Sequence, residues 1–181
     1  MKYLWYALII IGLLILYIII TRFININKEK IIYEELKIIA SKYNFLFNKV
    51  EKMHYDCILS NDNYDIYLKI FKIPSNSSVT INSKETWVLR WGGKRKGRNY
   101  PNQRYLNELI PFLKFNVPES EKVSIKVVAF YPDCEVILKY LNESEIDTVH
   151  PSSVSYGMKA IKYKELETNF NDLLILKEKR R

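Results

Sequence analysis

The stretch YDCILSNDNYDIYLKIF, residues 55–71, carries the clearest fold signal in this sequence. It opens with a short apolar run, continues through a polar turn at residues 61–63, and ends with residues 64–71, in which apolar and polar side chains alternate. Alternation with a period of two is typical of a β-strand that is buried on one face. Two such runs around a short polar turn predict an antiparallel β-hairpin.

Three helices are predicted from apolar side chains that recur at helical spacing. The first covers residues 28–43, and the last covers residues 163–176. The middle helix is predicted to begin near Pro101, because proline suits a first helical turn. Gln103 would then lean toward the packed face of this helix, close to its N-terminus.

Further strands are predicted on both sides of the middle helix. They cover residues 86–91, 123–131 and 135–140, with a short strand near Ala160. The order is helix, three strands that include the hairpin, helix, strands and helix. This order predicts an α/β domain with one mixed central β-sheet that is flanked by helices.

An apolar segment precedes this domain. Residues 3–20, YLWYALIIIGLLILYIII, contain no charged side chain. A helix of about 18 residues nearly spans the roughly 30 Å hydrocarbon core of a bilayer. A cleaved signal peptide is the alternative, but the apolar run is longer than usual and no small-residue cleavage pattern follows it. We therefore expect a transmembrane anchor at residues 1–22, an α/β domain at residues 23–176 and a basic tail at residues 177–181.

The charges around the apolar segment predict its orientation. Lys2 is the basic residue before it, whereas Arg22, Lys28 and Lys30 follow it closely. Basic flanks stay on the cytoplasmic side of a membrane. The sequence therefore predicts a single-pass protein of the cell membrane whose soluble domain faces the cytoplasm.

The net charge, the cysteines and the histidines indicate which partners and metal sites to expect. The net charge of +8 indicates an anionic partner, either nucleic acid or the anionic inner leaflet. Part of the lysine excess has another explanation, since an AT-rich genome favours Ile, Lys, Asn and Tyr in any protein. Cys57 and Cys134 lie in apolar runs and are predicted to be reduced core residues. His54 and His150 have no Cys or His at ligand spacing, which argues against a zinc site.

The hairpin also carries residues suited to phosphodiester chemistry. Metal-dependent cleavage requires carboxylates that hold Mg²⁺ or Mn²⁺ and commonly a lysine that stabilises developing charge. Asp56 on the first strand and Lys69 on the second meet part of this need, but Tyr67 stands where a second acid is wanted. Asp65, two residues earlier on the same strand face, is a candidate metal ligand with Asp56. It would require a shifted metal or a bridging water, because two residues span about 7 Å.

Four segments occur in an order that suggests a family. They are an acid on the first helix, the hairpin pattern YDCILSNDNYDIYLKI, a tryptophan-containing strand before the segment NYPNQ, and the strand VSIKVVAFY before a closing strand and helix. In these segments the chain resembles the nuclease-related domain (NERD), a branch of the PD-(D/E)xK restriction-endonuclease-like fold. The resemblance covers about residues 30–170. It departs from the family pattern at Tyr67, which replaces the glutamate of the Glu-x-Lys pair, and at Tyr100, which splits the Asn-Pro pair.

The resemblance implies roles for particular residues. Asp56, Lys69, Gln103 and Glu35 (or its neighbour Glu34) would be catalytic, and Mg²⁺ or Mn²⁺ would be the cofactor. Each residue also has a structural explanation. Asp56 could cap or pair within the hairpin, Lys69 could be solvated, and Gln103 could hydrogen-bond a helix start.

A basic segment adds a second functional signal. It contains four cations within five residues and has aromatic residues close to it, a combination that suits phosphate contact and base stacking. The alternative is a solvated loop tip or a clamp on anionic lipid headgroups. The residues predicted to bind nucleic acid are Lys94, Arg95, Lys96, Arg98, Trp91 and Tyr100.

Two interpretations follow from the sequence. In the first, a membrane-anchored NERD-like domain binds nucleic acid at the cytoplasmic face, and cleaves it if a metal site is complete. In the second, the domain is a catalytically inactive interaction module or a lipid-surface scaffold. The replacement of an acid by Tyr67 favours the second interpretation, whereas Asp56, Lys69 and the basic segment favour the first.

Overall fold

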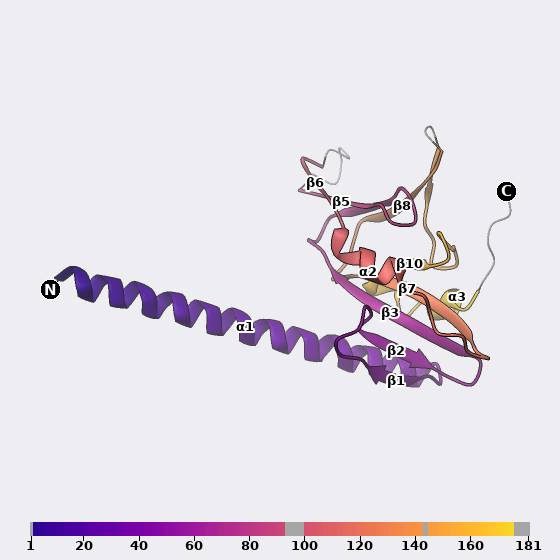
Figure 1. Cartoon of the computed structure of the whole chain (residues 1–181), viewed down its shortest axis with the longest axis horizontal. Coiled ribbons are helices and arrows are strands. Elements are labelled where there is room, and N and C mark those ends of the chain that lie inside the picture. The colour runs from indigo at the N-terminus through magenta and orange to yellow at the C-terminus, as the bar shows by residue number, and fades with distance from the viewer. Residues whose placement is uncertain (1, 93–99, 143–144, 176–181) are drawn as a thin grey trace. The chain divides into compact units, whose positions relative to one another are not determined.

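The computed structural model describes residues 2–92, 100–142 and 145–175 (Figure 1). The chain divides into two compact units, Met1–Ile39 and Ala40–Arg181. The first unit belongs to α1 (Lys2–Lys42), a continuous helix of 41 residues. The apolar segment and the predicted helix at residues 28–43 are therefore parts of a single helix.

The predicted hairpin lies in a five-stranded sheet, called here the first sheet. Its strand order is β1-β2-β3-β7-β10. The strand β3 pairs antiparallel with β2 and parallel with β7, and β7 pairs parallel with β10. The hairpin prediction is confirmed. The strands are β1 (Leu46–Lys49), β2 (Cys57–Ser60), β3 (Tyr64–Lys72), β7 (Val123–Tyr131) and β10 (Lys159–Lys162).

A second sheet of five strands has the order β6-β5-β4-β8-β9. Its pairings are antiparallel except for the parallel pair of β4 and β8. The α/β class and the mixed character of the sheets are confirmed, but the prediction of one central sheet is wrong. The strands are β4 (Ser78–Ile81), β5 (Trp87–Trp91), β6 (Asn102–Tyr105), β8 (Val136–Asn142) and β9 (Glu145–Thr148).

The two sheets are connected by a pair of parallel strands that changes sheet. The neighbours β3 and β7 end together, and the strands that follow them, β4 and β8, are neighbours again in the second sheet. Two backbone hydrogen bonds join the segment that links β3 to β4 with the segment that links β7 to β8. The amide of Ile73 donates to the carbonyl of Tyr131 at 2.8 Å, and the amide of Glu135 donates to the carbonyl of Ser77 at 2.7 Å. Pro74 and Pro132 stand at the two crossings, where a residue without an N–H group interrupts a ladder.

The helices of the second unit are short. They are η1 (Asn107–Leu109), α2 (Ile110–Lys114), η2 (Tyr163–Glu165) and α3 (Phe170–Leu173). The predicted start of the middle helix near Pro101 is wrong, because the next residues form β6 and the helix begins only after Leu106. The predicted last helix is interrupted between η2 and α3. Its final residue and the basic tail lie outside the described residues.

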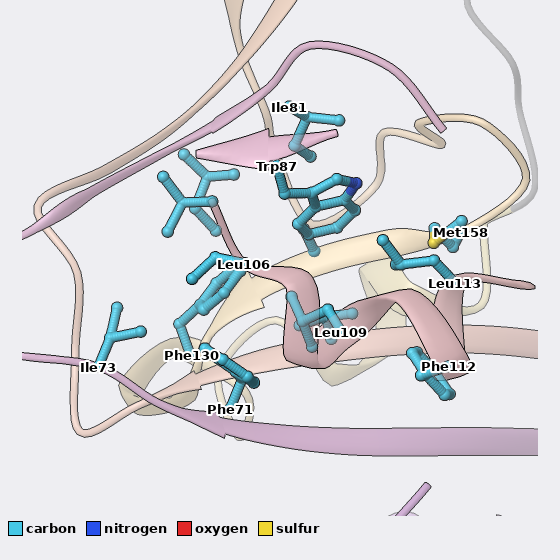
Figure 2. Packing of buried hydrophobic residues seen from close by; sticks show 14 of the residues in the cluster. Phe71, Ile73, Ile81, Trp87, Leu106, Leu109, Phe112, Leu113, Phe130 and Met158 are labelled. Carbon is cyan, nitrogen blue, oxygen red and sulfur yellow. The ribbon is translucent and has the colours of Figure 1, made fainter. Parts of the chain in front are cut away.

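The main core lies between the two sheets and encloses α2. Figure 2 shows Phe71 and Phe130 of the first sheet packing toward Leu109 and Phe112, with Trp87 of the second sheet above them. Directly opposite residues and residues two apart share a face of a sheet. The face of the first sheet that carries Lys69 is therefore the face that contacts this core.

Candidate functional site

Asp56 and Lys69 form an ion pair at the base of the β2–β3 hairpin. The Nζ of Lys69 donates to Oδ1 of Asp56 at 2.8 Å, and both side chains are 23% exposed. The other carboxylate oxygen, Oδ2, accepts the backbone N–H of Ile70 at 2.6 Å. The backbone N–H of Asp56 donates to the carbonyl of Leu68 at 2.9 Å. The prediction that Asp56 and Lys69 share one side of the sheet is confirmed.

Few oxygen ligands for Mg²⁺ or Mn²⁺ gather around this pair in the described residues. These ions take several oxygen ligands, whereas both oxygens of Asp56 already accept hydrogen bonds from the protein. In the described part of the chain, no group of three or more His, Cys, Asp or Glu side chains could hold a metal ion. The contacts of Asp56 with Lys69 and with the backbone of Ile70 fasten the segment before β2 to β3.

Asp65 lies at the opposite end of the hairpin. It pairs in register with Ser60, four residues along β3 from Lys69, which corresponds to about 13 Å. Its Oδ1 accepts a hydrogen bond from Ser60 Oγ and lies 3.7 Å from the ammonium of Lys122. The structure therefore does not bring Asp65 to Asp56, and it gives Asp65 a local partner instead.

Tyr67 is a core residue at the position where an acid was wanted. It is 6% exposed. Its ring centroid lies 5.1 Å from that of Tyr55 and 5.9 Å from that of Phe115. Burial raises the pKa of the Tyr67 hydroxyl above its ordinary value, so the group is neutral at physiological pH. An aromatic cluster thus separates Asp65 from Lys69 along the strand.

The remaining predicted catalytic residues lie elsewhere. Gln103 is an exposed residue of β6, on the edge of the second sheet, so its predicted place on the packed face of a helix is wrong. Glu35 belongs to α1 in the first unit, whereas the Asp56–Lys69 pair belongs to the second unit.

The predicted nucleic-acid residues map to the hairpin of β5 and β6. Trp91 of β5 pairs with Asn102 of β6, and the segment between them contains the basic residues. Trp91 is half-buried against the core, and the hydroxyl of Tyr100 donates to Oε2 of Glu135 at 2.6 Å. The four cations, Lys94, Arg95, Lys96 and Arg98, lie outside the described residues.

The hairpin also presents Arg90, a residue that the sequence patterns did not indicate. Arg90 pairs with Gln103, and Val88 pairs with Tyr105, so all four side chains share one face. Tyr105 is 61% exposed. The segment Asn102–Tyr105 has no alternation of apolar and polar residues that would have indicated this strand.

Two lysines in the interior were also missed. The Nζ of Lys126 donates to the carbonyls of Leu113 and Phe115 at 2.9 and 2.8 Å, which satisfies the C-terminal end of α2. Lys159 is 1% exposed, and its Nζ lies 2.7 Å from the carbonyl of Ile175, just after α3. Burial lowers the pKa of each lysine to about 8. A lysine within a strand-like run gives no sequence signal for such a role.

A groove of about 1000 Å³ opens beside β8 and β9. Its walls include Asp147, His150 and Tyr156, and the ammonium of Lys139 lies 5.0 Å from the ring centroid of Tyr156. None of the predicted site residues lines it.

No match is found for this chain among protein-family models, curated proteins or solved structures. Function is therefore inferred from the sequence and from the geometry and charge of the described residues.

Proposed function

We propose that this chain is a membrane-anchored, NERD-like domain that binds nucleic acid without sequence preference at the cytoplasmic face of the cell membrane. The observation that carries the proposal is the β5–β6 hairpin. Its connecting segment contains four cations, and one face of its strands adds Arg90 and the exposed ring of Tyr105. Cations that contact phosphates give affinity that does not depend on sequence.

The anchor is supported by α1. Its described residues include a stretch that is long and apolar enough to cross a membrane. Leu13, Leu14 and Ile15 are each more than half exposed, as expected of side chains that contact lipid. The basic residues after the apolar segment support the cytoplasmic orientation of the second unit.

Metal-dependent cleavage is the second candidate, and the 2.8 Å contact between Asp56 and Lys69 favours it. Three further features favour binding alone. Both oxygens of Asp56 accept protein donors, Asp65 has its own partner, and Tyr67 is buried among aromatic rings. We therefore expect binding with little or no cleavage.

The binding test uses the full chain in nanodiscs of zwitterionic lipid. The four cations of the connecting segment should contribute up to about −3.6 to the log–log slope of affinity against salt on duplex DNA. Replacement of Lys94, Arg95, Lys96 and Arg98 by Ala should remove most of that slope. A control with the same change in net charge replaces Lys49, Lys52, Lys72 and Lys114 by Ala, and it should retain the slope. If the wild-type protein binds no nucleic acid at low salt, the lipid-surface role becomes the better account.

The cleavage test adds Mg²⁺ or Mn²⁺ to the same complexes. Metal-dependent product that disappears in Asp56→Ala and in Lys69→Ala would establish a nuclease and would contradict binding as the sole function. Absence of product with saturating metal and intact binding would support the proposal.

A further inference from the structure

The second sheet has a face that is turned away from the core. One row of paired residues crosses all five strands on this face: Tyr105, Val88, Thr80, Leu138 and Thr148. None of them belongs to the main core cluster, whose contribution from these strands comes from the opposite face. We call the face that this row defines the outer face.

Exposure along the row is uneven. Tyr105 is 61% exposed at one edge, and Thr148 is exposed at the other. Val88 and Thr80, between them, are 7% and 1% exposed. The middle of the row is therefore buried, and Tyr105 is its exposed aromatic residue, at the β6 edge of the sheet.

The charges of the outer face suit an anion. Arg90 and Gln103 form the next paired row of this face, so Arg90 places a cation beside Tyr105. The carboxylates in the five described strands are Glu145 and Asp147. Both lie on the opposite face, because Asp147 pairs with Lys139 and Lys139 pairs with the core residue Ile81.

An exposed aromatic ring next to a cation favours one form of nucleic acid. In a duplex the faces of the bases are covered by their neighbours, whereas a single strand can offer a base to a protein ring. Such stacking depends little on sequence, because every base has a π-face.

We propose that the β6 edge of the outer face binds single-stranded nucleic acid, with Tyr105 stacked on a base and Arg90 in contact with the phosphate backbone. This inference rests on the proposed function and names its substrate class. In this inference Tyr105 supplies the preference for a single strand.

The test measures binding of a labelled oligothymidine and of a duplex of equal length to the full chain in zwitterionic nanodiscs. The single strand should bind more tightly. Tyr105→Ala should weaken single-strand binding by about 5- to 150-fold, the range measured for loss of one stacked base, and leave duplex binding unchanged. Tyr105→Phe keeps the ring and should retain affinity, whereas Tyr105→Leu should lose it.

Leu46→Ala is the matched control, because Leu46 is a 72% exposed residue on β1, an edge strand of the first sheet. It should change neither affinity. The inference would be overturned if the single strand and the duplex bind equally well and Tyr105→Ala changes neither affinity. The proposed function would still stand in that case. Loss of binding to both in Tyr105→Ala, with an unchanged melting temperature, would also overturn the assigned preference. Absence of binding to either by the wild-type protein would overturn both proposals.

Discussion

Tyr67 stands at the position where the predicted metal site would require an acid. An acid at this position would be a metal ligand, but the ring packs between Tyr55 and Phe115. Tyr67→Glu should therefore lower the free energy of unfolding by about 3 kcal/mol or more, since it removes a buried ring and buries a carboxylate. It should produce no Mg²⁺- or Mn²⁺-dependent cleavage. Chemical denaturation and a cleavage assay on the same protein measure the two effects.

The conservative change Tyr67→Phe is the control, because it keeps the ring. It should be nearly neutral for stability. A Tyr67→Glu protein that is as stable as the wild type and cleaves nucleic acid with metal would contradict the core role assigned to Tyr67.

Lys126 allows a test by pH. Burial, with a smaller contribution from the charge of Lys84, lowers its pKa from 10.5 to about 8. Between these values the unfolded chain binds the proton and the folded chain does not, so stability rises with pH in this window. From pH 8 to 10.5, the unfolding free energy of the wild type should therefore rise relative to that of Lys126→Met.

The comparison with Lys126→Met isolates this lysine. Burial raises the pKa of the thiols of Cys57 and Cys134, which opposes the trend above about pH 9, but both proteins share these groups. Circular dichroism melts of the two proteins in detergent micelles across this range supply the data. A constant difference, or one that moves against the wild type, would show that Lys126 is not responsible.

Residue contacts were predictable from the sequence only where they are local. The pair of Asp56 and Lys69 follows from strand alternation and a short turn, because both residues belong to one hairpin. The burial of Tyr67 does not follow, because alternation defines two faces and does not say which one a second sheet will cover. The role of Lys159 depends on carbonyls near α3, which its own strand does not reveal.

At the scale of elements, the long apolar strands were predicted, whereas the short central strand β4 and the polar edge strand β6 were missed. The runs of β3 and β7 are long and apolar enough to be recognised alone. In contrast, Asn102–Tyr105 is fully exposed and is a strand because it pairs with β5. Pro101 predicts a helix start because proline favours the first helical turn, but the pairing of β6 with β5 overrides this local preference.

The helix α1 is longer than a bilayer requires. Its 41 residues correspond to about 60 Å, roughly twice the hydrocarbon thickness. Only the uncharged part should lie in the membrane. An arginine at the centre of that part costs about 3 kcal/mol, so Ile15→Arg should release a large share of the protein into the soluble fraction after a carbonate wash.

The control for this change lies on the same helix. Ile38 is 67% exposed and lies beyond the uncharged part, so Ile38→Arg should leave the protein in the membrane pellet. Full retention of Ile15→Arg, or equal release of both variants, would argue against a spanning helix.

At the scale of the whole molecule, the division into two sheets could not be predicted. It depends on parallel pairing between strands that are far apart in sequence, such as Tyr64 with Val123 and Ser78 with Val136. Each strand alone fits either one sheet or two. The α/β class was predictable because it requires only the order of helices and strands.

The orientation of the molecule is a further whole-chain property that the flanking charges predict and that labelling can measure. Cys57 and Cys134 are buried, with 0% and 3% exposure, so a membrane-impermeant maleimide should not label the wild-type protein. Leu46→Cys adds one exposed thiol to the second unit. Because the basic residues after the apolar segment stay in the cytoplasm, this thiol should be labelled only after the cells are permeabilised. Labelling in intact cells would place the second unit outside, where the proposed binding of cytoplasmic nucleic acid could not occur.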